Sequence, residues 1–311
     1  MLLAVASVLP AQNSTSLLNY GDFESWIVRH VKESSVLGGD VKTLYEIGPA
    51  AVWDNNDAYT NQGGSPWATS NVLARVAGIT KTNTSVYRDW RGNGNGYCAK
   101  LVTHTEGCKV LGVVNIYVLA AGSIYFGATQ EPITSSNNPM SKLNAGIPFT
   151  RKPVALQFDY KVQLSGASDR IRRTGFSPVK TVSGKDMPDV VLLLKKRWED
   201  SDGNIHAKRV GTLVHRFDKS TDWVNNARFT IHYGDIRNES FYRSYMDLRT
   251  GENTKYALNS QGKMVKVVEE GWGSADDTPT HMILQFDSSF GGAYVGAEGT
   301  TFWIDNVKMV Y

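Results

Sequence analysis

Three tryptophans stand in polar parts of the sequence rather than in apolar runs. Trp53 and Trp67 belong to the segment 51–71, and Trp272 lies in the segment 269–282. Both segments are rich in Gly, Asn, Asp or Ser, a composition typical of exposed loops. A flat indole offers a π face on which the apolar C–H face of a sugar ring can stack. The sequence therefore predicts a carbohydrate-binding site on these loops. The hydrogen-bonding neighbours that we expect beside the rings are Asp57, Asn71 and Arg88.

A structural role is the alternative for the loop tryptophans, which would then cover the ends of the fold. Three other tryptophans, Trp26, Trp198 and Trp303, adjoin or lie in apolar stretches. We expect those three to belong to the hydrophobic core.

The acidic and histidine residues form no recognisable catalytic motif. A glycosidase needs two carboxylates about 5–10 Å apart, and the E-x-D-x-x-E pattern of some jelly-roll glycosidases is absent. The six histidines are scattered, without an H-E-x-x-H motif, and neither a G-x-S-x-G elbow nor a P-loop occurs. Catalytic residues therefore stay unassigned, and binding without catalysis is favoured. The alternatives are a glycoside hydrolase on the same scaffold and, ranked lower, an adhesion or assembly protein.

Acidic residues recur in similar aromatic surroundings near the two ends of the chain. "NYGDFESW" at 19–26 contains Asp22 and Glu24, and "FWIDNVKMVY" at 302–311 contains Asp305. If the two stretches are neighbours in space, their carboxylates and backbone carbonyls could form an oxygen cage for a structural Ca²⁺ or an equivalent polar clamp. The alternative is that these acids are solvated or cap turns.

The last ten residues change phase in their apolar pattern. Phe302 and Ile304 share one face of a strand, whereas Val307 and Met309 have the opposite parity. A shift by one residue moves every side chain to the other face unless a β-bulge takes up the extra residue. The pattern therefore predicts a bulge at Asp305, in a strand that closes the fold.

Strand signals dominate the rest of the chain. The segment 154–164 alternates apolar and polar residues at period two. The segments 189–199 and 206–217 flank "DSDGN", in which Asp-Gly predicts a hairpin turn. Evidence for helices is thin, although 70–78 could form two turns. Many short strands with turns between them predict an all-β protein, a single β-sandwich or jelly-roll domain.

Composition limits the partners. The chain has 311 residues with 33 Lys and Arg against 30 Asp and Glu, and no long basic block. Nucleic acid is therefore an unlikely partner. No stretch reaches the roughly 18 apolar residues that a membrane-spanning helix needs. We expect a monomer that binds a polysaccharide or oligosaccharide.

The first residues resemble the end of a secretory signal. An apolar run at 2–9 is followed by "PAQ", although the usual basic residues before such a run are missing. We expect residues 1–16 to be signal-like or disordered and 17–311 to form the domain, in a protein exported to the periplasm or cell surface. Export would permit a disulfide between Cys98 and Cys108, and two free thiols are the alternative.

Several stretches together resemble known families. The two end motifs are similar to those that bracket jelly-roll carbohydrate-binding modules, which often hold a structural calcium. From about residue 17 to its end, the chain resembles the putative carbohydrate metabolism domain family, found in exported proteins of gut Bacteroidetes. This resemblance implies a jelly roll with a role in glycan binding or metabolism at the cell envelope, and it carries over no catalytic residues. The stretches that carry it are "GDFESW", "PWATSNVLARVAGI", "GYCAKL", "NAGIPFTRKPVALQFDYK", "VLLLKKRWEDSDGNIHAKRVGT" and "TFWIDNVKMVY".

Overall fold

β-strands form nearly all the regular structure of this chain. The computed structural model describes residues 14–311, except 62–63, 77, 93, 111–113, 136–137 and 176. The expected signal-like run at 2–9 lies outside the described residues. No helix in the described part has the length and apolar content needed to span a membrane. The helical elements described are four short 3-10 turns: η1 (Ser35–Leu37), η2 (Pro139–Lys142), η3 (Ser244–Met246) and η4 (Gly251–Asn253).

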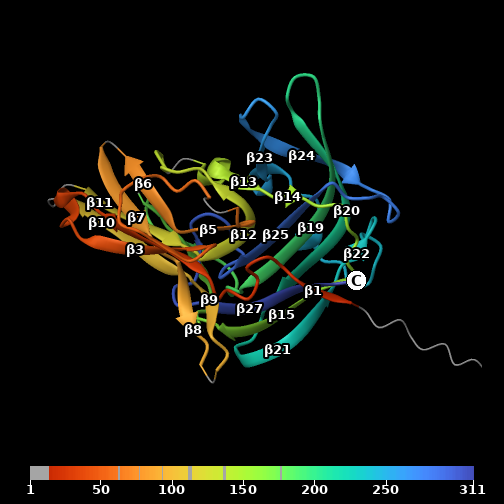
Figure 1. Cartoon of the computed structure of the whole chain (residues 1–311), viewed down its shortest axis with the longest axis horizontal. Helices are drawn as coiled ribbons and strands as arrows, with labels where there is room; N and C mark the ends of the chain where they lie inside the picture. The colour runs from red at the N-terminus through yellow and green to blue at the C-terminus, as the bar shows by residue number, and fades with distance from the viewer. Residues whose placement is uncertain are drawn as a thin grey trace, which may run out of the picture.

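Two large sheets pack face to face, as the lower right and centre of Figure 1 show. In the first sheet the strand order is β21-β15-β27-β9-β8, and β1 also pairs with β27. Its strands are β1 (Thr15–Leu17), β8 (Val86–Trp90), β9 (Tyr97–Val102), β15 (Ala155–Gln163), β21 (Thr221–Thr230) and β27 (Thr301–Val310).

The second sheet has the order β14-β25-β19-β20-β24-β23-β13-β12-β5, with β22 paired to β20 and β12 also paired to β25. Its strands are β5 (Trp67–Thr69), β12 (Ser123–Thr129), β13 (Leu143–Ala145), β14 (Ile147–Pro148), β19 (Asp189–Glu199), β20 (Ile205–Arg216), β22 (His232–Tyr233), β23 (Tyr256–Leu258), β24 (Met264–Trp272) and β25 (His281–Asp287).

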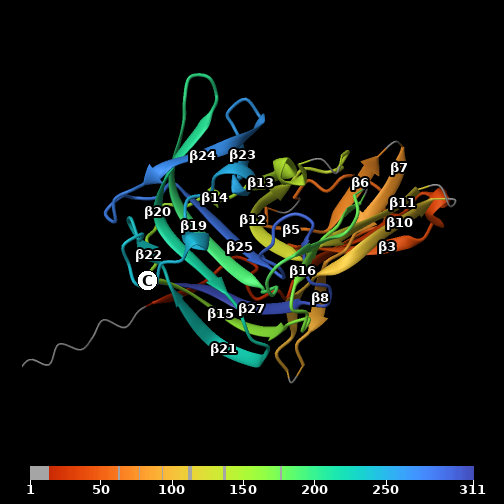
Figure 2. The same ribbon diagram turned by 180° about the vertical axis from the view of Figure 1, so that it is seen from behind.

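Smaller sheets form a lobe beside the sandwich, at the left of Figure 1 and the right of Figure 2. They are separate from the two large sheets in their hydrogen bonding. Their strands are β2 (Trp26–Lys32), β3 (Val41–Ile47) and β4 (Ala51–Trp53); β10 (His104–Val110), β11 (Val114–Ala120) and β17 (Thr174–Gly175); β16 (Arg170–Arg172), β18 (Lys180–Val182) and β26 (Val295–Gly296); and β6 (Val72–Val76) with β7 (Ile79–Asn83).

The main hydrophobic core lies between the two large sheets. Alternation at period two sends Leu156 and Phe158 of β15 into it from one side, and Val190 and Leu192 of β19 from the other. All four side chains are fully buried. The all-β sandwich in one domain is therefore confirmed, as is the strand predicted for 154–164.

The closing strand behaves as its phase change predicts. β27 pairs with β15 on one side and with β9 on the other, and its register against β15 slips between Gln157 and Asp159. Asn306 takes up the extra residue with a φ of 53°. Leu18 N donates to Val307 O at 2.9 Å beside the β1–β27 pairing, so the two ends of the described chain do meet.

The hairpin predicted at "DSDGN" joins β19 to β20, and Gly203 in its turn has the positive φ that the turn needs. The two helical turns considered for 70–78 are wrong. That segment forms β6, which pairs with β7 in a hairpin turning at Gly78, where φ is 77°. The local pattern was too short to separate a helix from a strand.

Candidate functional site

Trp67 is a core residue, and the exposed position predicted for it is wrong. Its side chain is fully buried, and its ring centroid lies 4.5 Å from that of Phe126. The indole Nε1 donates a hydrogen bond to the backbone oxygen of Asn19 at 2.8 Å. The reason is that β5, although only three residues long, pairs with β12 inside the second large sheet.

Asn71 is also buried, against the sequence prediction of an exposed neighbour to a sugar. Its Nδ2 donates to the backbone oxygens of Tyr45 and Val86, each at 2.8 Å. Its Oδ1 accepts from the backbone N–H groups of Ser85 and Val86. The side chain therefore ties three backbone segments together and has its hydrogen bonds filled by the protein.

The other predicted binding residues are dispersed. Trp53 lies on β4, partly buried, with its ring centroid 5.7 Å from that of Tyr59. Asp57 is exposed in the following loop. Arg88 is exposed on β8, with its guanidinium 4.5 Å from the centroid of the Tyr97 ring. Trp53 and Arg88 belong to different sheets and Asp57 to a loop, so their shared role in a binding site stays a prediction.

The core prediction holds for one of the other three tryptophans. Trp26 is buried, whereas Trp198 is 40% exposed and stacks on His206. Trp303 is only partly buried, because odd-numbered positions before the bulge of β27 face away from the core. Apolar neighbours in sequence did not reveal which face of the strand each indole occupies.

Asp305 forms a polar clamp with residues other than those predicted. Its carboxylate accepts a hydrogen bond from Arg91, which also bonds Asp159 Oδ2 at 2.8 Å. Burial raises the pKa of Asp305 to about 6, although Arg91 opposes that rise. Asn306 Nδ2 donates to Asp159 Oδ2 at 3.0 Å.

Asp22 and Glu24 make local contacts instead. Asp22 Oδ1 accepts from the backbone N–H of Glu24, whose own Oε1 accepts from Tyr97 N at 3.1 Å. Within the described ranges, no group of three or more His, Cys, Asp or Glu side chains is placed to hold a metal ion. The positive charge at Asp305 comes from Arg91, and a structural Ca²⁺ stays a prediction that a melting curve with chelator would test.

Cys98 is a buried free thiol.

A different set of polar residues forms a row across the second large sheet. Asp189 is the register partner of Asp287 on β25 and of Arg216 on β20, and Asp287 is the partner of Ser123 on β12. Val190 points into the main core. Because side chains alternate along a strand, Asp189 points to the opposite face of the sheet. Four strands thus bring four polar side chains to one level.

Asp189 and Asp287 are a pair of adjacent carboxyls. Both are buried, and burial is the main cause that raises the pKa of each. The charge of Asp287 raises the pKa of Asp189 further. Asp287 also accepts from Ser123 Oγ, and at 2.9 Å from Gln285 Nε2. Two adjacent carboxyls in low dielectric hold a proton between them.

The segment that follows β22 covers this face of the sheet. Tyr245 and Met246 of η3 pack on a small apolar cluster of the same face. The guanidinium of Arg216 lies 4.2 Å from the centroid of the Tyr245 ring and 3.7 Å from that of Phe290. The apolar cluster consists of Ala145, Val191, Leu193, Val214 and Ile283.

Two more cations face the carboxyl pair from the covering segment. Burial lowers the pKa values of Arg249 and Lys255, an effect that the neighbouring carboxyls partly oppose. Lys255 Nζ donates to Gln285 Oε1 at 2.7 Å. Three buried atoms here have no hydrogen-bond partner within the protein: Asp189 Oδ1, Arg216 Nε and Arg249 Nε. Buried polar atoms are rarely left unpaired, so their concentration marks this site as one suited to a polar ligand or water. We call Ser123, Asp189, Arg216, Arg249, Lys255, Gln285 and Asp287 the acid-pair site.

A second charged group lies further along the same strands. Glu269 of β24 bonds Lys195 Nζ at 3.0 Å and Arg209 Nε at 2.8 Å, and all three side chains are buried. Burial lowers the pKa of Lys195 to about 7, whereas the two cations hold that of Glu269 at about 2 against the effect of burial. Trp272 places its ring 5.6 Å from the Arg209 guanidinium. Among the binding residues predicted from sequence, Trp272 is thus the one that contacts this charged group.

Sequence reasoning missed the acid-pair site, although one signal was present. Asp189 begins a seven-residue buried run of β19, and Asp287 ends the buried part of β25. An acid inside a buried strand is costly unless it is paired or protonated. Each acid alone is ordinary, and only the pairing of strands about 100 residues apart in sequence brings the two together.

Comparison with known proteins gives the family. The model of the putative carbohydrate metabolism domain matches residues 41–310. The chain belongs to this family. Asp189 and Asp287 both lie within the matched region, so the acid-pair site is part of the carbohydrate metabolism domain. Among curated proteins, none matches the chain.

Two solved structures are similar to the chain. One is titled a putative glycoside hydrolase from Bacteroides thetaiotaomicron, with 18% identity and a TM-score of 0.45, over 88% of this chain and 76% of that one. The other is titled a putative glycoside hydrolase from Bacteroides vulgatus, with 12% identity and a TM-score of 0.43, over 95% of this chain and 94% of that one. At these values the likeness carries no argument about activity.

Proposed function

We propose that this carbohydrate metabolism domain binds a glycan at the acid-pair site and does not cleave it. The observation that carries the proposal is the row of Ser123, Asp287, Asp189 and Arg216 across four strands, with unpaired polar atoms at its centre. The family relates the domain to carbohydrates. The site then supplies the groups that a sugar would need.

Sugar hydroxyls both donate and accept hydrogen bonds, so a sugar site needs acceptors and donors side by side. Asp287 and Gln285 offer acceptor oxygens, while Arg249 and Lys255 offer donors. The Tyr245 ring supplies an aromatic surface next to them. Since η3 and the residues after it cover the site, a glycan would enter as this segment moves aside.

The direct pairing of the two carboxyls across neighbouring strands favours binding over hydrolysis. Glycosidases hold their two carboxylates about 5–10 Å apart, with the sugar or a water between them. Here the two carboxyls occupy directly paired positions on neighbouring strands, and both are buried. They would act as one hydrogen-bonding unit rather than as a separate acid and nucleophile.

Glycoside hydrolysis is the second candidate, and one observation favours it. A general acid must keep its proton near neutral pH, and burial beside Asp287 raises the pKa of Asp189 well above its usual range. If the covering segment moved aside, Asp189 would face a bound sugar in the protonation state that an acid catalyst needs.

A glycan array, read both for retention and for released reducing ends, separates the two functions. We expect retention of at least one glycan without release. Asp287→Asn should weaken binding about tenfold or more, since a lost hydrogen bond to a charged group costs about 1.4 kcal/mol or more. Asp202→Asn, in the exposed hairpin turn, is the matched control and should bind normally. Release of sugar by the parent that is abolished in Asp189→Asn would show that the function is hydrolysis rather than binding. If the folded protein neither retains nor releases any glycan, both candidate functions are wrong.

Two further parts of the proposal rest on sequence. The apolar run at 2–9 supports export to the periplasm or cell surface, which N-terminal sequencing of the native protein would test. Trp53, Asp57 and Arg88 would be contacts for distant parts of a long glycan, because none of them lies in the sheet that carries the acid-pair site.

A further inference from the structure

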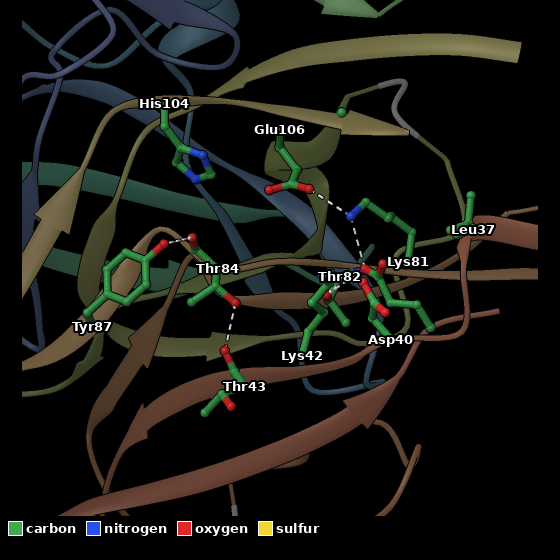
Figure 3. A pocket seen from close by; sticks show the side chains of 12 residues that line it. Leu37, Asp40, Lys42, Thr43, Lys81, Thr82, Thr84, Tyr87, His104 and Glu106 are labelled. Carbon is green, nitrogen blue, oxygen red and sulfur yellow. Dashed lines mark hydrogen bonds and ion pairs between the residues drawn. The ribbon is translucent and has the colours of Figure 1, made fainter. Parts of the chain in front are cut away.

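A polar groove with a volume of about 580 Å³ lies in the lobe beside the sandwich. Figure 3 shows the side chains that line it, with His104 and Glu106 on one side and Lys42 and Thr43 on the other. The groove shares no residue with the acid-pair site. Its volume is within the range of small-ligand sites, roughly 300–1,000 Å³.

Three separate hairpins build the groove. The end of β2 and the start of β3 give Glu33, Asp40 and Lys42, β7 gives Lys81, and β10 gives His104 and Glu106. β3, β7 and β10 lie together at the left of Figure 1, away from β19 and β25. The strand pairing within each hairpin fixes the positions of the lining residues that the hairpin contributes.

The charges of the lining leave one carboxylate in excess. Lys81 Nζ bonds Glu33 Oε1 at 2.9 Å and Glu106 Oε1 at 2.7 Å, as Figure 3 shows. Lys42 Nζ bonds Asp40 Oδ2 at 3.1 Å. Three acids thus face two lysines within the groove. Such a lining attracts a cation or a neutral donor and repels an anion.

Hydrogen bonds within the protein hold the polar side chains of the groove in place. Glu33 accepts from Thr82 N at 2.9 Å and from Thr82 Oγ1 at 2.8 Å in addition to Lys81. Burial alone would raise the pKa of Glu33, but these partners lower it, so it stays ionised. Tyr87 donates its hydroxyl to Thr84 O at 2.7 Å, which orients its ring at the groove. His104 Nε2 has no hydrogen-bond partner within the protein.

We infer that this groove is a second sugar-binding site, specific for an amino sugar. The ligand ammonium would pair with Glu106, whose carboxylate shares Lys81 with Glu33 and carries the excess charge of the lining. The Tyr87 ring and the unpaired His104 Nε2 would then contact the sugar ring and one of its hydroxyls. An acid sugar would be excluded by the same charges.

Calorimetry with three oligosaccharides of equal length tests the ligand class. The probes are a chitosan hexamer with free amines, its N-acetylated counterpart and a hexagalacturonate. We expect binding of the chitosan hexamer, at least about tenfold weaker binding of the N-acetylated hexamer, and none of the hexagalacturonate. Equal binding of the chitosan hexamer and its N-acetylated counterpart would show that the amine has no role. Preferred binding of the hexagalacturonate would show that the groove is not an amino-sugar site.

Variants assign the binding to this groove. Glu106→Gln removes one carboxylate, leaves Lys81 its bond to Glu33, and should weaken chitosan binding about tenfold or more. Asp202→Asn has the same change of charge at an exposed turn and should leave binding unchanged. Glu106→Gln should still retain the glycan that the acid-pair site binds, so a failure of the acid-pair site and a failure of the groove give different results. Loss of chitosan binding in Asp287→Asn, with Glu106→Gln intact, would move the amino sugar to the other site and end this inference. Melting curves show that each variant is folded.

Discussion

At the scale of single residues, the hydrogen-bond and charge partners of a buried acid decide whether its pKa is raised or lowered. Burial raises the pKa of Asp159, but Asn226 N, Asn306 and Arg91 outweigh it, and the pKa is lowered overall. Asp189 is buried too, but it faces another carboxyl, and its pKa is raised. The first acid is therefore a carboxylate in a structural clamp, and the second is a proton holder.

The pH dependence of stability should show the proton held at Asp189. A carboxyl whose pKa is raised by folding contributes stability that is fully present below its unfolded pKa of about 3.9 and is lost as the pH rises through its folded pKa. Asn at this position carries no titrating proton. We therefore expect the melting temperature of Asp189→Asn to fall less than that of the parent between pH 5 and pH 9, by at least about 2 °C. Parallel pH profiles of parent and variant would show that the pair does not share a proton.

At the scale of elements, the sequence predicted where strands form better than it predicted which side chains they bury. The alternation of β15, the Asp-Gly turn between β19 and β20 and the bulge of β27 follow from local rules, and all three are present. The sequence analysis did not predict β5, because three residues are too few to show the alternation of a strand. The "GGSP" before it is also typical of a loop. Trp67 was therefore assigned to an exposed loop when it lies in the core.

Removing the Trp67 indole should be far more harmful than removing that of Trp53. Trp67 is fully buried and contacts Phe23, Phe126 and Phe286, so alanine would leave a large cavity. Deletion of a buried tryptophan typically costs about 3–5 kcal/mol. Trp53→Ala, at a partly buried edge position, should cost roughly 1 kcal/mol. Urea unfolding of both variants measures the difference, and equal losses would mean that Trp67 is not part of the core.

At the scale of the whole molecule, the sandwich followed from the sequence but the acid-pair site did not. Period-two patterns and turn residues fix how many strands form and roughly where, and they do not state which strands become neighbours. Ser123, Asp189, Arg216 and Asp287 come from four strands whose order is set only by the packed sheet. The groove likewise depends on three hairpins that touch without being adjacent in sequence.

The cooperativity of the whole fold should depend on its last strand. β27 lies between β15 and β9 in the centre of the first sheet, and Phe302, Ile304 and Met309 fill the core from it. Deleting residues 302–311 would expose two unpaired strand edges and that core, so we expect an insoluble or unfolded product. Deleting residues 1–17 is the matched control, because β1 is exposed and pairs only with β27. That truncation should keep a single cooperative melt within a few degrees of the parent, since an exposed three-residue edge strand buries little. Circular dichroism of both truncations separates the cases. A soluble protein lacking 302–311 with the parent's melt would mean that β15 and β9 close the sheet without β27.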